Sequence, residues 1–127
     1  MKTLKLSVLP QRLAVCRLDP DEMIPDWVRQ CDFWSVTRTD EELSVVLPEA
    51  SVPRAWKTEE GWRCLKVHGP LDFSLTGVLA SLASPLAEAG ISIFAISTYD
   101  SDYILVRDKD LERAETVLSA YGHVIEA

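Results

Sequence analysis

The order in which strand-like and helix-like segments alternate after residue 61 most strongly restricts how this chain can fold. Strands are expected where short β-branched, aromatic or alternating apolar runs occur, and helices where apolar residues recur about every 3.6 positions. The segments are, in chain order, a strand over 62–67, a helix over 75–89, strands over 91–97 and 103–106, a helix over 111–121 and a strand over 123–125. This β-α-β-β-α-β order predicts an α+β fold in which two helices cover one face of an antiparallel sheet.

Residues at the helix ends support this order, which is that of ferredoxin-like domains. Gly90 directly follows the first helical stripe, where a helix-ending glycine is common. Asp108 and Asp110 are candidate N-caps of the second helix. Pro85 lies inside the first stripe and removes one backbone donor, so we expect a single helix that is bent or weakened there.

The first sixty residues show a reduced version of the same plan. A pair of strands is expected over 4–9 and 13–18 because Pro10 interrupts the run, and Pro25 suits the first turn of a short helix. A hairpin is expected from 33–37 and 43–47. The pattern then breaks at Pro48, Pro53 and a charged run that ends at Gly61. We therefore expect two small domains, 1–60 and 61–127, of which the first is the reduced one.

Composition excludes several classes of partner. The chain has 127 residues and a formal net charge of -7, which opposes binding to nucleic acid and to anionic membrane surfaces. It lacks the run of about 20 apolar residues that a membrane-spanning helix needs, and its start does not resemble a secretion signal. The three cysteines are far apart and odd in number, so reduced thiols in a cytoplasmic protein are expected, with Cys64 buried in its strand.

The sequence contains no recognisable catalytic or metal-binding motif. Only two histidines are present, His68 and His123, and neither has a partner at the spacing of a zinc site. The chain also lacks a serine-nucleophile elbow, a phosphate-binding loop and a dinucleotide-binding glycine pattern. We therefore expect a protein that is not an enzyme, with no catalytic residues, no metal and no cofactor.

Three segments together resemble the ACT domain family. They are the loop and helix start Gly69-Pro70-Leu71-Asp72-Phe73-Ser74-Leu75-Thr76-Gly77-Val78, the helix end Pro85-Leu86-Ala87-Glu88-Ala89-Gly90-Ile91-Ser92-Ile93, and the strand end Ile96-Ser97-Thr98-Tyr99. The close resemblance covers 61–121, and it extends to small bacterial tandem-ACT proteins and to the ACT repeats of CASTOR-type arginine sensors. It implies a regulatory module that binds a small molecule, an amino acid in the usual case.

The resemblance also implies a binding site formed by two segments. The expected ligand-binding residues are Asp72, Phe73, Ser74, Leu75, Thr76, Gly77 and Val78 at the helix start, and Ser97, Thr98, Tyr99 and Asp102 at the strand end. A helix start offers free N–H groups to a carboxylate, and Asp102 could hold an ammonium group. Leu75 stands where the arginine sensors have an acidic residue, so arginine itself is not specified.

Each segment also has a purely structural interpretation. Gly77 could permit close helix packing or a positive φ angle, and Ser97 to Asp102 could be an ordinary acidic turn. The chain would then be a protein–protein interaction module that binds no metabolite. Under the ligand-binding hypothesis, the first domain, through Phe33 to Thr37, or another subunit would complete the site. We expect a homodimer formed through ACT sheet edges.

Overall fold

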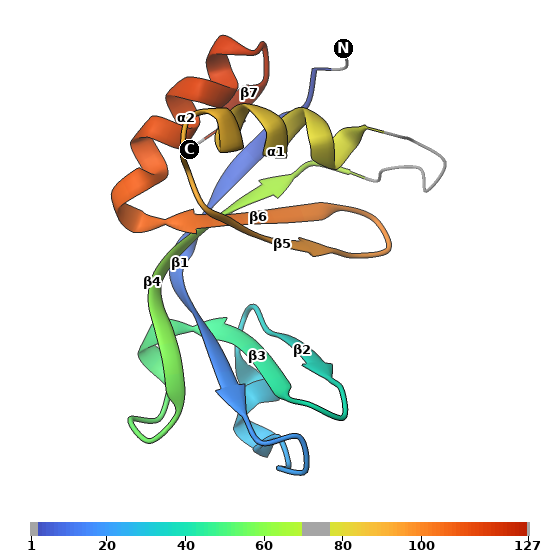
Figure 1. Cartoon of the computed structure of the whole chain (residues 1–127), viewed down its shortest axis with the longest axis vertical. Helices are drawn as coiled ribbons and strands as arrows, with labels where there is room; N and C mark the ends of the chain where they lie inside the picture. Colours follow the sequence, from blue (N-terminus) through green and yellow to red (C-terminus); the bar gives the residue numbers. More distant parts are fainter. Residues whose placement is uncertain (1–2, 70–76, 127) are drawn as a thin grey trace. The chain divides into compact units, whose positions relative to one another are not determined.

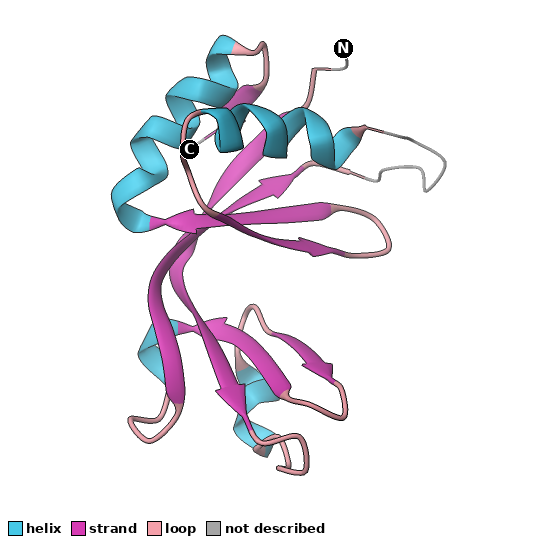
Figure 2. Cartoon of the chain, viewed as in Figure 1, coloured by secondary structure: helices cyan, strands magenta, loops and turns pink. Residues whose placement is uncertain are grey.

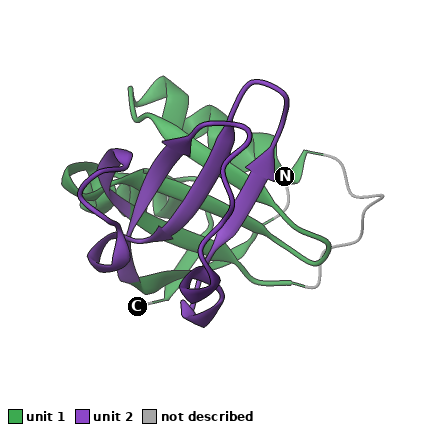
Figure 3. Cartoon of the chain, turned by 90° about the horizontal axis from the view of Figure 1, so that it is seen from below, with its two compact units in different colours: residues 1–10, 63–127 green, residues 11–62 purple. Residues whose placement is uncertain are grey.

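The computed structural model describes residues 3–69 and 77–126 and divides the chain into two compact units (Figure 3). Unit 1 comprises Met1–Pro10 and Arg63–Ala127, and unit 2 comprises Gln11–Trp62. This division differs from the expected 1–60 and 61–127, since the first ten residues join the later unit. The cause is strand pairing, because the start of β1 (Lys5–Leu18) pairs in parallel with β7 (Val124–Glu126) at the chain's end.

Two strands are longer than the sequence indicated. The expected pair of strands around Pro10 is one strand, β1, of 14 residues. Pro10 lies between the part of β1 that pairs with β7 and the part, from Leu13 onward, that pairs with β3 (Leu43–Pro48). A residue without an N–H group is tolerated at this change of partner. Similarly, the charged run that was expected to mark a domain boundary begins strand β4 (Lys57–Val67).

Unit 1 has the α+β architecture predicted from the sequence (Figures 1 and 2). Its strands lie in the order β7-β1-β4-β6-β5, in which β5 (Ile93–Ser97) and β6 (Asp102–Arg107) form an antiparallel hairpin. Helices α1 (Val78–Glu88) and α2 (Leu111–Ala120) cover one face of this sheet. A short 3-10 helix, η3 (Asp108–Asp110), precedes α2. The β-α-β-β-α-β order from β4 to β7 is confirmed, and β1 adds a strand between β7 and β4.

The core of unit 1 lies between this sheet and the two helices. Alternate residues of each strand point to the helical face, and the helices contribute residues from their apolar stripes. The fully or almost fully buried members are Leu4, Leu6, Leu65, Val67, Leu82, Leu86, Ile91, Ile104, Val106, Ala114 and Leu118. Because Leu65 and Val67 belong to this core, the residue between them lies on the other face of the sheet.

The end of α1 follows the prediction made for Gly90. This residue has a φ angle of 74°, its N–H donates to the Ala87 carbonyl at 3.0 Å, and the Ile91 N–H donates to the Leu86 carbonyl at 2.9 Å. These are the two hydrogen bonds of a Schellman motif, which requires a left-handed residue that glycine adopts without strain. Helix α2 ends with the equivalent pair of bonds. Pro85 lies inside α1, as expected.

Unit 2 is built from strands and short 3-10 helices. Its strand order is β2-β3-β1-β4, and β2 (Ser35–Arg38) and β3 form the expected antiparallel hairpin. The short helix expected near Pro25 is a 3-10 helix, η1 (Asp26–Gln30), and a second, η2 (Glu49–Ser51), follows β3. Trp27 of η1 stacks on Trp56 with ring centroids 5.8 Å apart. Unit 2, all of which is described, contains no α-helix.

The core of unit 2 is separate from that of unit 1. Its buried members are Ala14, Cys16, Leu18, Val28, Leu43, Val45 and Leu47, and Trp56 packs against them. Not every aromatic residue of unit 2 belongs to this core, since Trp34 is 43% exposed. Across the described part of the chain, no helix is both long and apolar enough to cross a membrane.

Candidate functional site: a hollow beside the β5–β6 turn

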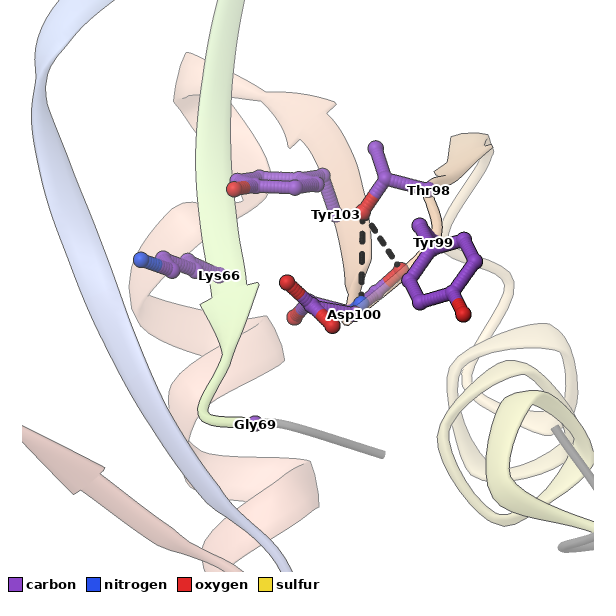
Figure 4. Close-up of a pocket in the computed structure, with 7 residues that line it drawn as sticks. Lys66, Gly69, Thr98, Tyr99, Asp100 and Tyr103 are labelled. Atoms are coloured by element: carbon purple, nitrogen blue, oxygen red, sulfur yellow. Dashed lines mark hydrogen bonds between the residues drawn. The ribbon is translucent and has the colours of Figure 1, made fainter. Parts of the chain in front are cut away.

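The turn between β5 and β6 is fixed by its own side chains (Figure 4). The Thr98 N–H donates to the Ser101 carbonyl at 2.8 Å, which closes the turn. The Thr98 hydroxyl accepts from the Ser101 N–H at 3.2 Å and donates to the Ser101 carbonyl at 3.1 Å. Threonine and serine side chains stabilise turns in this way because they replace backbone partners. The backbone from Thr98 to Ser101 therefore has a defined conformation.

Ser101 also ties this turn to the neighbouring strand. Its side chain is buried, with 7% of the residue exposed, and its hydroxyl donates to the Val67 carbonyl near the end of β4. A buried hydroxyl needs such a partner, because leaving it without one costs free energy. The turn is thus held against β4 at the point where the chain leaves the sheet at His68 and Gly69.

A hollow of about 660 Å³ lies beside this turn, entirely within unit 1. Its walls come from β4, the segment after it, the turn and β6 (Figure 4). The lining residues are Lys66, Gly69, Thr98, Tyr99, Asp100, Ser101 and Tyr103. The volume is within the range of about 300–1,000 Å³ that is usual for sites of small molecules. The lining residues carry two phenol rings, one cation, one carboxylate and two aliphatic hydroxyls.

The expected strand-end residues divide into two groups. Thr98 and Tyr99 line the hollow, and Tyr99 is 78% exposed. Ser97 and Asp102 instead face each other as partners across the β5–β6 hairpin, and the Ser97 hydroxyl donates to Asp102 Oδ1 at 2.5 Å. The carboxylate on the wall of the hollow belongs to Asp100, which is not among the expected ligand-binding residues.

The helix-start segment is described only from Gly77 onward. Gly77 is the N-cap of α1, with φ 78° and ψ 0°, and its carbonyl accepts from the Ser81 N–H at 2.9 Å. Val78, the first helical residue, is half-buried and packs against the core of unit 1. Gly77 was expected, on its structural interpretation, to permit close helix packing or a positive φ angle. The structure shows the positive φ angle. The other expected ligand-binding residues, Asp72, Phe73, Ser74, Leu75 and Thr76, lie outside the described residues.

Sequence reasoning missed several residues that line the hollow. Lys66, like Arg63, is a charged residue between two buried positions of β4, and Tyr103 precedes the buried Ile104 in β6. In both strands the period of two places these side chains on the face opposite the helices. That alternation was visible in the sequence. The pairing of β4 with β6, which brings Lys66 and Tyr103 to one place, was not.

Ser7, His68 and Glu126 lie together but do not form a catalytic triad. The Ser7 hydroxyl and one Glu126 carboxylate oxygen both face Nε2 of His68, the latter at 3.6 Å. A serine nucleophile activated by histidine needs the acid on the other ring nitrogen, so that one tautomer is fixed. Within residues 3–69 and 77–126, no group of three or more His, Cys, Asp or Glu side chains is arranged to hold a metal ion.

The fold defines unit 1 as a ferredoxin-like α+β module with a small-molecule-sized hollow at a strand end. A family model of the ACT domain matches residues 57–120, half of the chain, and the chain therefore belongs to the ACT domain family. A second family model, described as an N-terminal domain, matches residues 11–55, which fall within unit 2.

Named relatives and a solved structure agree with this assignment. The human protein CASTOR3P is 32% identical over 133 aligned residues, which cover 91% of this chain and 80% of that protein. The cytosolic arginine sensor for mTORC1 subunit 1 of Bos taurus is 31% identical over 93 residues, or 65% of this chain. The chain spans only 28% of that sensor's length. The crystal structure of protein Atu0741 from Agrobacterium tumefaciens has a TM-score of 0.93 and 40% identity, and the match covers 99% of this chain and 94% of that one.

Proposed function

We propose that this chain is a regulatory module that binds a small molecule of the amino-acid class and does not change it chemically. The observation that carries the proposal is the hollow at the β5–β6 turn, whose polar groups are held in place by Thr98 and Ser101. A preformed site loses little conformational entropy when a ligand binds. The name of the bovine relative, an arginine sensor, supports an amino acid as the class of ligand.

A thermal-shift screen against the twenty L-amino acids tests this function. A ligand at 100 times its dissociation constant adds about 2.7 kcal/mol to the free energy of unfolding, which raises the melting temperature by several degrees. The test variant is Thr98→Val, which keeps the shape of the side chain but removes the hydroxyl that fixes the turn. We expect at least one amino acid to stabilise the native chain and to stabilise Thr98→Val less. The absence of any shift across the screen would contradict the proposal.

A second candidate function, docking of a protein partner, is favoured by exposed apolar side chains of unit 2. Met23 is 84% exposed, and Trp34 is 43% exposed. Large apolar residues that remain exposed often belong to binding surfaces. A flat amino-acid screen, together with loss of a partner on Trp34→Ser but not on Thr98→Val, would favour this function over ligand binding.

We also propose a cytoplasmic homodimer that pairs through the edge of the unit 1 sheet. Strand β5 ends the strand order, and its residues 93–97 include no proline and no charge that would discourage pairing with a second strand. Ala95→Lys places a charge on this edge, and Ala120→Lys, in an exposed position of α2, is the control. We expect Ala95→Lys alone to convert the dimer to a monomer in sedimentation equilibrium. A monomeric native chain would contradict the dimer.

A further inference from the structure

We infer that Lys66 and Asp100 are the charge-specific residues of the hollow, with Lys66 binding a carboxylate and Asp100 an ammonium group of the same ligand. The ligand class is then a free α-amino acid, recognised through both charges of its backbone. This inference rests on the proposed function, and it adds two residues to those that the family resemblance implied.

The position of Lys66 suits it to hold an anion. Its neighbours in β4, Leu65 and Val67, are completely buried in the core of unit 1, so Lys66 lies on the opposite face, where it lines the hollow. The residue as a whole is half-buried. Among the ion pairs of the described residues, none includes Lys66.

Asp100 supplies the opposite charge from a fixed segment of backbone. It lies between Thr98 and Ser101, whose mutual hydrogen bonds close the turn, and Ser101 is anchored to Val67. Like Lys66, Asp100 takes part in none of the ion pairs found in the described part of the chain. Asp102 is the poorer candidate, because its carboxylate already accepts the Ser97 hydroxyl and does not line the hollow.

Two opposite charges on the walls of one hollow select against ligands that carry a single charge. A simple anion attracted by Lys66 is repelled by Asp100, and a simple cation attracted by Asp100 is repelled by Lys66. A zwitterion interacts favourably with both groups, and each contact is a charge-assisted hydrogen bond. Tyr99 and Tyr103 leave aromatic surface for the ligand's side chain.

Calorimetry with chemically matched probes tests the inference. The twenty L-amino acids are titrated one at a time at millimolar concentration, and the tightest binder is compared with its methyl ester and its N-acetyl derivative. The ester lacks the carboxylate charge, and the N-acetyl derivative lacks the ammonium charge. The protein variants are Lys66→Met and Asp100→Asn, with Lys109→Met and Glu112→Gln as controls at exposed positions in η3 and α2. Equal melting temperatures of all variants would show that they remain folded.

We expect Lys66→Met and Asp100→Asn each to weaken binding at least about tenfold, the size expected for loss of a charge-assisted contact, while the controls bind as the native chain does. Neither modified probe should bind. Lys66→Arg should retain most of the affinity because it keeps the charge. If an amino acid binds equally well to the native chain, Lys66→Met and Asp100→Asn, the inference is overturned and the proposed function stands. If no amino acid binds the native chain, both are overturned.

Discussion

At the scale of single residues, two buried polar side chains join elements of unit 1 that are distant in sequence. Ser101 links the β5–β6 turn to β4, and His123 links Leu4, the residue before β1, to α1. His123 is 3% exposed, and its Nδ1 accepts the Leu4 N–H at 3.2 Å. That nitrogen must be unprotonated, so the neutral ring carries its proton on Nε2, which donates to the Ser81 carbonyl at 3.2 Å.

Replacing His123 by leucine should destabilise the protein although leucine is the more apolar residue. The Leu4 N–H and the Ser81 carbonyl would each lose a partner, and each buried unsatisfied group costs about 1–3 kcal/mol. We expect a loss of roughly 2–4 kcal/mol in urea denaturation. The control is His68→Leu, which removes only exposed contacts to Ser7 and Glu126 and should cost less than about 1 kcal/mol. Equal losses would contradict the structural role of His123.

Cys64 should make stability depend on pH in the alkaline range. Burial raises the pKa of its thiol to about 12 from an ordinary value of 9.0. Between these values the unfolded chain releases the thiol proton while the folded chain retains it, so the free energy of unfolding falls as pH rises. The slope from this group approaches about 1.4 kcal/mol per pH unit.

Denaturation of the native chain and of Cys64→Ala at pH 8, 9.5 and 11 isolates this contribution. We expect the native chain to lose more stability than Cys64→Ala as pH rises, because only the native chain carries this titrating thiol. Cys16, whose pKa burial also raises, remains in both proteins and cancels in the comparison. Parallel pH profiles for the two proteins would show that Cys64 is accessible to water.

At the scale of elements, the two ends of α1 depend on glycines in left-handed conformations. Gly90 ends the helix in a Schellman motif, and Gly77 precedes its first residue with a φ angle of 78°. The space around Gly77 is open, since no described atom lies within 4 Å of where a Cβ would be. Backbone strain, rather than overpacking, therefore decides the effect of a side chain at this position.

Gly77→Ala should consequently destabilise the apo protein by about 1–2 kcal/mol, the cost of a left-handed conformation for an ordinary residue. Gly77→Asn is the matched control, because asparagine adopts this conformation more readily and should cost less. Chemical denaturation of both variants measures the difference. A gain of stability in Gly77→Ala would instead mean that Gly77 has ordinary helical dihedral angles.

At the scale of the whole molecule, the two units share two strands. Both β1 and β4 begin in one unit and continue in the other, and each unit has its own hydrophobic core. A strand that loses its partners in one unit cannot keep its full length, so we expect the units to unfold together. The distribution of residues allows a direct test, because all four tryptophans lie in unit 2 and both α-helices lie in unit 1.

Urea unfolding should therefore give the same midpoint by tryptophan fluorescence, which reports on unit 2, and by circular dichroism at the helical band, which reports on unit 1. Coincident transitions are the expected behaviour of a cooperative two-state protein. Two separate midpoints would show that the units fold independently in spite of the shared strands. The comparison needs no substitution, so it is free of effects of mutation on either core.

Local sequence determined the elements of unit 1 and the class of its fold. Helix periodicity, Gly90 and the strand runs after residue 61 are signals carried by neighbouring residues, and each corresponds to an observed element. Steric and hydrogen-bonding preferences act over only a few residues, which is why these elements could be predicted. The burial of Cys64, expected from its place in the strand over 62–67, is confirmed.

Only the tertiary structure decided how distant strands pair, and with them the candidate site. The sequence at Pro10 indicates a strand end, but pairing with β7 and then with β3 keeps β1 continuous, because hydrogen bonds along a ladder outweigh one missing donor. In the same way, β4 and β6 bring Lys66 to the turn that carries Asp100, from positions 34 residues apart. No local pattern specifies such a pairing, because it depends on contacts between segments that the sequence separates.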